Sequence, residues 1–265
     1  MNETDAIIKE TRQTFGKWWI ISGILLAFVL VLLAIAIQYV PNYRAIKQIR
    51  AMGGYVETEP GFLSSFLPEG LQRAFNESLF GSAVGEITII VLSGPTVDDK
   101  KVATLKKLVN PNGLALISDK LTDDSLIHLK EMSNLHRLRI NSLLVTDDGL
   151  LHLKSLPNLT EFAIQGTLIT DAGLLHLSEL VNLKLLSLEK TKVTNDGLAH
   201  LNKMTNLEIL LLNDSDISDA GLVHLKKMTK LKHLHLNSTR VTAEGIKELK
   251  AALPTCEIDW SPAAP

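Results

Sequence analysis

Five histidines spaced 24 residues apart are the first residues in this sequence whose type and spacing suggest chemistry. They are His128, His152, His176, His200 and His224. Imidazole is a common zinc ligand, so a regular column of histidines raises a metal hypothesis. Each histidine belongs to a different short helix of the pattern described below, and packed helices lie about 8–10 Å apart, too far for successive imidazoles to share one metal easily. We therefore interpret the column as structural, serving stacking or hydrogen bonding in every repeat.

A second histidine pair lies on an expected strand. His233 and His235 alternate with leucines, so both side chains face the same side of that strand. Two imidazoles at this spacing could bind a metal or respond to pH, and Glu257 and Asp259 are expected on the following strand. The preceding strand offers only aliphatic residues, so we favour an ordinary polar contact surface over a metal site.

No other combination of residues predicts catalysis. The sequence has no nucleophile–base grouping, glycine-rich phosphate loop or metal motif, so we expect no enzyme activity and no cofactor. The net charge of −2 provides no general basic field for nucleic acid. The single cysteine, Cys256, excludes an intramolecular disulfide and provides no cysteine framework for zinc.

The elements that must position these residues follow an internal period of 24. Five consecutive blocks begin LTDDSLIHL, VTDDGLLHL, ITDAGLLHL, VTNDGLAHL and ISDAGLVHL, at residues 121, 145, 169, 193 and 217. Two apolar columns step by 24 from Ile90 to Ile258 and from Leu92 to Trp260. Because residues i and i+2 share one side of a strand, the columns predict eight short parallel strands around one continuous core. Such a period predicts a solenoid, which favours a binding surface over an enclosed catalytic pocket.

A turn and a short helix are expected after each strand. In the repeat that starts at residue 169, leucines recur at helical spacing on one face. Thr170 is the predicted N-cap, Asp171 suits the positive end of the helix dipole, and Gly173 is expected to allow close approach to a neighbour. Asparagine precedes four of the next strands and is expected to serve the helix-to-strand turn, at Asn134, Asn158, Asn182 and Asn206, whereas Lys230 takes this place in the following block.

The pattern L-x-x-L-x-L-x-x-T-x-[IV]-T-D-x-G-L-x-x-L over about residues 86–260 resembles the leucine-rich repeat family, most closely its 24-residue bacterial class and the repeats of F-box-type proteins. The resemblance implies an α/β fold, a right-handed solenoid with parallel concave strands, short convex helices and a protein-binding role. Many family members carry asparagine where this chain has Leu143, Thr167, Thr191, Ser215 and Thr239. A hydroxyl can still donate to a neighbouring backbone carbonyl, so we expect this row of hydrogen bonds to fail only at Leu143.

Specificity on a repeat scaffold is carried by positions that do not repeat. On the concave strands we expect an exposed apolar centre of Leu185, Ile209 and Leu211, with basic residues toward one end and histidines toward the other. The alternative is that solvent tolerates three aliphatic side chains. The candidate protein-binding residues are Arg137, Arg139, Glu161, Leu185, Glu189, Ile209, Leu211, Asn213, His233 and His235.

Residues 18–40 are predicted to cross a membrane. They include twenty consecutive residues without charge, from Trp18 to Ile37, which match the thickness of a bilayer as a helix. A cleaved signal peptide is the alternative, but the apolar run is longer than a usual signal core. Close to the span, three lysines and arginines precede it (Lys9, Arg12 and Lys17) and three follow it (Arg44, Lys47 and Arg50), so charge does not orient the span. We expect the short tail, residues 1–17, to stay inside and the solenoid to face the extracytoplasmic side.

Residues 41–85 depart from the period and are predicted to cap the solenoid, since its first core layer would otherwise meet water. Within them, Tyr43–Met52 predicts a helix, Tyr55–Glu57 a short strand and Pro68–Leu79 a second helix. A separate interaction element is the alternative for this segment.

At the C-terminal end of the solenoid, residues 86–260, we expect Ile258 and Trp260 to close the core and residues 261–265 to form a disordered tail. The sequence thus predicts a single-pass, membrane-tethered scaffold that binds an unidentified protein. An extracytoplasmic carbohydrate- or cell-wall-binding protein is the first alternative, and a non-catalytic subunit of a membrane complex is the second.

Overall fold

The computed structural model describes residues 44–58, 87–105, 110–166 and 168–262. The predicted tail 1–17, the predicted span 18–40 and the predicted helix Pro68–Leu79 lie outside the described residues. Among the residues that are described, no helix is long and apolar enough to cross a membrane. Apart from Arg44, the described residues belong to one compact unit that comprises residues 45–59 and 86–265.

One nine-stranded sheet runs through this unit in chain order, and from β2 onward all neighbouring strands are parallel. The strands are β1 (Gly54–Thr58), β2 (Ile87–Ser93), β3 (Gly113–Ile117), β4 (Arg137–Asn141), β5 (Glu161–Gln165), β6 (Leu185–Ser187), β7 (Ile209–Leu211), β8 (His233–His235) and β9 (Glu257–Asp259). The pairing advances by one repeat per strand, so that Leu138 lies opposite Phe162. The predicted parallel strands are confirmed.

The two apolar columns form the core, as expected. Both columns are buried in every layer from the first, Ile90 and Leu92, to the one before the last strand. The last layer differs, because Ile258 and Trp260 are only half-buried. No described strand covers them from the far side, and the indole Nε1 of Trp260 donates a hydrogen bond to the carbonyl of Val241 at 3.1 Å. Trp260 therefore partly covers the core and does not lie inside it.

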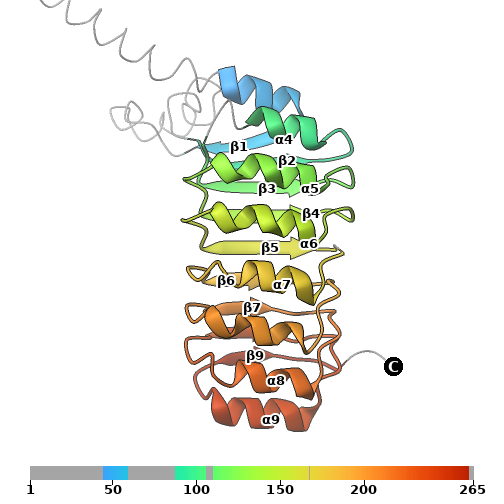
Figure 1. The fold of residues 1–265 in the computed structure, drawn as a ribbon, viewed down its shortest axis with the longest axis vertical. Coiled ribbons are helices and arrows are strands. Elements are labelled where there is room, and N and C mark those ends of the chain that lie inside the picture. The colour runs from blue at the N-terminus through green and yellow to red at the C-terminus, as the bar shows by residue number, and fades with distance from the viewer. Residues whose placement is uncertain (1–43, 59–86, 106–109, 167, 263–265) are drawn as a thin grey trace, which may run out of the picture. The chain divides into compact units, whose positions relative to one another are not determined.

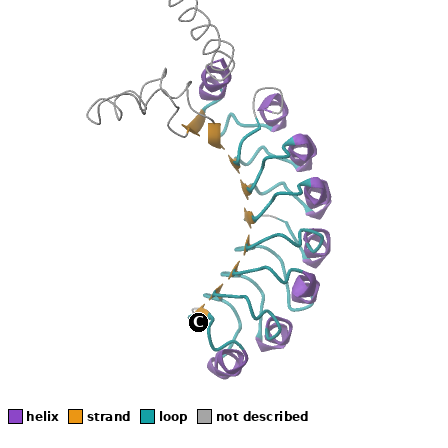
Figure 2. Ribbon diagram, turned by 90° about the vertical axis from the view of Figure 1, so that its left-hand side faces the viewer, coloured by secondary structure: helices purple, strands orange, loops and turns teal. Residues whose placement is uncertain are grey.

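Helices lie on the side of the sheet toward which the two apolar columns point. They are α4 (Asp99–Leu105), α5 (Asp123–Ile127), α6 (Asp147–Leu150), α7 (Asp171–Leu177), α8 (Asp219–Leu225) and α9 (Ala243–Ala252), with the 3-10 helices η2 (His128–Glu131), η3 (Leu151–Ser155) and η4 (Gly197–Lys203). The repeats follow one another in chain order (Figure 1). Seen from the side, the strands line the inner side of an arc and the helices its outer side (Figure 2). This arrangement confirms the expected concave sheet and convex helices.

Neighbouring repeats are joined where their helices begin, by the aspartate and threonine of the T-D-x-G motif. Asp171 accepts hydrogen bonds from the backbone N–H of Thr194 at 2.8 Å and from its hydroxyl at 2.7 Å. The same two bonds join Asp99 to Thr122, Asp123 to Thr146, Asp147 to Thr170 and Asp219 to Thr242. The expected role of Asp171 at its own helix dipole is therefore incomplete, because the carboxylate also holds Thr194 of the next repeat.

The glycine of the same motif leaves room for this carboxylate. A Cβ added to Gly197 would lie 2.2 Å from Oδ1 of Asp171. Corresponding conflicts with the preceding repeat arise at Gly149, Gly173, Gly221 and Gly245. Ser125 takes this place in the first helix pair, so that interface accommodates a side chain. The close approach predicted for Gly173 is confirmed.

The turns that follow the later strands carry the expected hydroxyls, which donate to nearby backbone carbonyls as predicted. Their hydroxyls donate to the carbonyl three residues earlier in the same turn, from Thr191, Ser215 and Thr239. The residue before each hydroxyl has a left-handed φ, of 57° at Lys190, 54° at Asp214 and 57° at Ser238. The bonds therefore stabilise each turn by itself and do not join it to a neighbouring repeat.

The earlier turns use a serine one position sooner. Ser142 donates to the carbonyl of Leu121 at 2.7 Å, and Ser118 does the same to Val97. These two bonds do cross to the preceding repeat. The hydrogen bond expected to be absent at Leu143 is thus supplied by Ser142, and the Leu143 side chain is 57% exposed. The corresponding residue of the next repeat, 167, lies outside the described residues.

The N-terminal end of the sheet is covered by a helix and an antiparallel strand. Residues 44–51 are helical, and Ile46 and Ile49 are buried. Strand β1 pairs antiparallel with β2. Both elements were predicted as part of the cap, while the rest of that predicted cap, residues 41–43 and 59–85, lies outside the described residues.

Candidate binding surface

The open side of the sheet brings the candidate residues into rows that run across the strands. The first row contains Arg137, Glu161, Leu185, Ile209, His233 and Glu257. The second contains Arg139, Ala163, Ser187, Leu211, His235 and Asp259. Because each row is formed by paired strands, residues that are 24 apart in sequence become direct neighbours. The predicted basic, aliphatic and histidine segments therefore lie in that order on one face.

The exposure of these rows is uneven. Arg137, Arg139, Glu161 and His233 are exposed, whereas Leu185, Ile209 and Leu211 are half-buried and Ser187 is buried. Neighbouring strands lie only about 4.8 Å apart, so side chains within a row cover one another. Two shallow hollows of about 250 Å³ and 140 Å³ lie here, and Arg139 and Leu185 line both. The aliphatic centre is therefore a partly covered floor and not the open island that the sequence predicted.

The histidine pair of β8 faces the carboxylates of β9. Nδ1 of His233 lies 3.3 Å from Oε2 of Glu257, and Nδ1 of His235 lies 3.3 Å from Oδ2 of Asp259. Each imidazole thus has its own carboxylate. In the part of the chain that the structure describes, no group of three or more histidine, cysteine, aspartate or glutamate side chains could hold a metal.

A third row, formed by Glu189, Asn213 and Asn237, holds the edge of this face together. Asn213 donates from its side-chain amide to Oε1 of Glu189, and its own amide oxygen accepts the backbone N–H of Asn237 at 2.8 Å. Asn237 in turn donates to Oδ2 of Asp259 at 2.7 Å. These side chains are engaged with one another, so Glu189 and Asn213 fix the edge of the face in addition to lining it.

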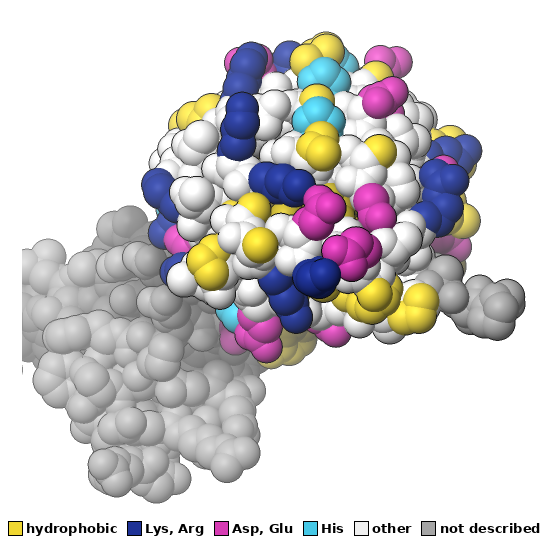
Figure 3. Space-filling view, turned by 90° about the horizontal axis from the view of Figure 1, so that it is seen from below, with side chains coloured by type: hydrophobic (Ala, Val, Ile, Leu, Met, Phe, Trp, Pro, Cys, Tyr) yellow, Lys and Arg dark blue, Asp and Glu magenta, His cyan; other side chains and the backbone are white. Residues whose placement is uncertain are grey.

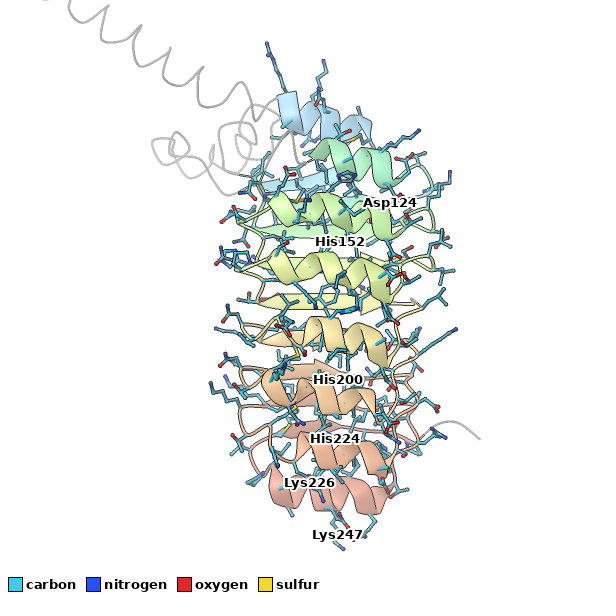
Figure 4. The ribbon with its side chains drawn as sticks, in the orientation of Figure 1. Asp124, His152, His200, His224, Lys226 and Lys247 are labelled. Carbon is cyan, nitrogen blue, oxygen red and sulfur yellow. The ribbon has the colours of Figure 1, made fainter. Side chains whose placement is uncertain are left out.

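The column of five histidines lies on the convex side, away from this face. Figure 4 labels three of them, His152, His200 and His224, which come from separate helical segments. All five side chains are half-buried. Nδ1 of His176 is the only buried side-chain nitrogen or oxygen in the described residues that lacks a hydrogen-bond partner. The column is thus a set of separate side chains, each within its own repeat.

A groove that the sequence did not predict lies along the flank where the chain passes from helix to strand. It has a volume of about 480 Å³ and is lined by His136, Pro157, Asn158, Thr160, Asn182, Lys184, Asn206, Glu208 and Lys230. The asparagines donate to the preceding repeat, as Asn182 does to the carbonyl of Pro157 at 3.2 Å. Their predicted role in the helix-to-strand turn is confirmed.

Glu208 sits among lysines in this groove. Nζ of Lys232 donates a hydrogen bond to Oε2 of Glu208. This bond and the charge of Lys232, with smaller contributions from Lys184 and Lys230, hold the pKa of the Glu208 carboxyl below its ordinary value. Lysine and arginine side chains form a line along one flank in Figure 3. A spacing of 24 places Lys184, Glu208 and Lys232 in one column, and that spacing was the sequence signal for this cluster.

Comparisons with known proteins find distant structural likeness. No protein-family model matches the sequence, and no curated protein matches it significantly. The chain is similar to an internalin (inlF) of Listeria monocytogenes, with 18% identity, 65% of this chain and 54% of that chain covered, and a TM-score of 0.46. A leucine-rich-repeat protein of Leptospira interrogans shows 20% identity, coverage of 60% and 38%, and a TM-score of 0.42. An internalin C2 of Listeria monocytogenes shows 19% identity, coverage of 78% and 100%, and a TM-score of 0.47.

The chain therefore spans about half of the length of the first of these structures and 38% of the second. Such distant likenesses carry no argument about what the chain binds. The architecture follows from its own sheet and core. The described part of the chain is an α/β solenoid with a parallel sheet.

Proposed function

We propose that this chain is a protein-binding scaffold that uses the concave face of its solenoid and is tethered to a membrane by residues 18–40. The observation that carries the proposal is the contrast between the two sides of one sheet. The inward columns repeat as buried apolar residues, whereas the outward rows change in character from strand to strand. Charged ends around a half-buried aliphatic floor have the anatomy of a protein contact.

The face is also organised before a partner binds. Its residues come from hydrogen-bonded strands, and side-chain hydrogen bonds already link Glu189, Asn213, Asn237 and Asp259. A preorganised surface loses less conformational entropy on binding, so more of the contact energy contributes to affinity. The partner that fits best is a protein with an apolar side chain for the floor and a carboxylate for Arg139.

Two substitutions test the use of the concave face. In the full-length chain, Leu211→Glu should keep the fold but weaken partner binding on the order of tenfold or more, because it places a charge on the floor. Arg139→Glu should weaken it by reversing the charge beside the floor. Leu143→Glu, at an exposed leucine outside the three rows, is the matched control. Unchanged partner recovery with both concave variants would refute this use of the face.

The partner, the tether and the extracytoplasmic orientation are tested together by proximity labelling in native membranes. A labelling enzyme fused to the C-terminus should mark extracytoplasmic proteins, and the chain should stay in the membrane fraction after alkaline washing. A shortened, soluble chain would instead support cleavage of the N-terminal segment as a signal peptide. Labelling of proteins inside the cell alone would contradict the orientation.

Carbohydrate binding is the less supported alternative. The amide-bearing third row would favour it, but Asn213 and Asn237 already use these groups on neighbouring side chains and backbone. The outward rows of the described strands β4 to β9 also contain no phenylalanine, tyrosine or tryptophan on which a sugar ring could stack.

A further inference from the structure

The convex helices present a second surface, which the concave site does not use. One outward position of each repeat is apolar in the five repeats from α5 to α8, at Ile127, Leu151, Leu175, Ala199 and Val223. Leu151 is 46% exposed, Leu175 49% and Val223 53%. We call these five residues the convex stripe. It ends in α9, where Lys247, labelled in Figure 4, takes the corresponding place.

Opposite charges flank the convex stripe. On the side where the helices begin, exposed aspartates occur at Asp124, Asp148 and Asp196. On the side where they end, exposed lysines occur in the same three repeats, at Lys130, Lys154 and Lys203. Figure 4 labels Asp124 on the side where the helices begin.

These charges are hardly used within the chain. Among the described residues, no ion pair involves the side chains of Asp148, Asp196 or Lys154, and Lys203 makes only a 3.9 Å contact with Glu179 in which both side chains are more than half exposed. An apolar stripe between an acidic and a basic edge is complementary to the same stripe of a second copy related by a two-fold rotation. A second copy of this chain therefore satisfies both edges at once.

We propose that two copies of this chain pair back to back through the convex stripe, about a two-fold axis parallel to the stack of repeats. This axis sets each helix antiparallel against the same helix of the other copy. Asp148 then faces Lys154 of the second copy, and the pairs Asp124 with Lys130 and Asp196 with Lys203 repeat the contact in the neighbouring repeats. An axis across the stack would set aspartates against aspartates, so charge selects the parallel axis.

The arrangement has two consequences. Both concave faces stay free, so pairing is independent of the proposed concave function. Both solenoids also run in the same direction, so two chains tethered through the same N-terminal segment can pair in one bilayer. Because the stripe lies on the outer side of an arc, the contact is centred on Leu151 and Leu175 and opens toward both ends of the stack.

Cysteine crosslinking of the full-length chain in detergent tests the axis. In a Cys256→Ser background, Leu175→Cys should form a disulfide dimer under mild oxidation, because residue 175 meets itself across the axis. Leu143→Cys, whose native side chain is even more exposed but lies outside the stripe, should not. Equal crosslinking at both positions, or none at position 175, would overturn the proposal.

A charge exchange tests the pairing without oxidation. Asp148→Lys and Lys154→Asp should each raise the dimer dissociation constant on the order of tenfold or more, because each sets like charges together twice. Mixing the two variants should restore a heterodimer, and the double variant should restore the homodimer, as measured by sedimentation. A monomeric wild-type chain would refute self-pairing. If Leu175→Glu instead abolished binding of a different protein and left the dimer intact, the surface would belong to that partner and self-pairing would also be refuted.

Discussion

Replacing Gly197 with alanine is expected to loosen the contact between two neighbouring repeats. The new Cβ would lie 2.2 Å from Oδ1 of Asp171 and 2.8 Å from its Cγ, so the carboxylate must move. That carboxylate accepts the backbone N–H of Thr194 at 2.8 Å and its hydroxyl at 2.7 Å. A displaced carboxylate cannot keep both bonds, and Thr194, just before η4, loses its support from the preceding repeat.

The size of the effect follows from these contacts. Hydrogen bonds to a charged acceptor contribute roughly 1.5–3 kcal/mol each, and partial solvent exposure keeps these two near the lower end. Alanine in a helix is about 1 kcal/mol more favourable than glycine, which offsets part of the loss. The free energy of unfolding should therefore fall by about 2–4 kcal/mol for Gly197→Ala.

Urea unfolding followed by circular dichroism measures this change, and a second background isolates its cause. With Asp171→Ala in place, Gly197→Ala should cost almost nothing, because the obstructing carboxylate is absent and its hydrogen bonds are already lost. The contact that remains, 3.2 Å to Cβ of residue 171, is offset by the greater helix propensity of alanine. Ser125→Ala is the control, since this position already holds a Cβ and should lose only its hydrogen bond to the carbonyl of Thr122, about 1 kcal/mol. An equal cost of Gly197→Ala in both backgrounds would refute the reasoning.

Two further predictions concern other contacts between repeats. Ser142→Ala should lower the free energy of unfolding by about 1–2 kcal/mol, because the carbonyl of Leu121 loses its buried donor. In the same urea assay, Leu143→Ser should change the free energy of unfolding by less than about 0.5 kcal/mol. Equal effects of the two substitutions would contradict the assignment of the bond to Ser142. Lys232→Met should raise the pKa of Glu208 toward its ordinary value of 4.5, measured by NMR titration of the side-chain carboxyl. Because the folded pKa is lowered, the contact stabilises the fold above pH 4.5 and this stabilisation is lost as the pH falls through the lowered pKa; a pKa unmoved by the substitution would show that Lys232 is not its cause.

Residues that do the same thing in every repeat were predictable from the sequence. The columns through Leu138 and Ile140 are apolar at a fixed interval, and a parallel sheet is the arrangement that buries both columns in every layer. Gly173 was assigned correctly because a glycine that recurs at one place indicates close approach. The same period placed Arg139 and His235 on one face, since residues that flank an inward side chain must point outward.

Contacts that depend on the distance and direction between repeats could not be derived in this way. The carboxylate of Asp171 reaches Thr194, which is 23 residues away, and nothing local to the aspartate indicates this. Ser142 replaces its neighbour Leu143 as the hydroxyl donor because the earlier turns follow a different path from those with a left-handed residue. Half-burial of Leu211 is likewise set by the side chains on the strands beside it.

The sequence by itself determined the repeat length, the order of the strands and which side of each strand is buried. These follow from hydrophobic periodicity, because every repeat must cover the apolar face of the one before it. Only the tertiary structure decided which polar atoms meet across repeats, how open the concave floor is and how acidic and basic edges flank the convex stripe. Those features depend on the spacing and curvature of the stack, to which all repeats contribute together.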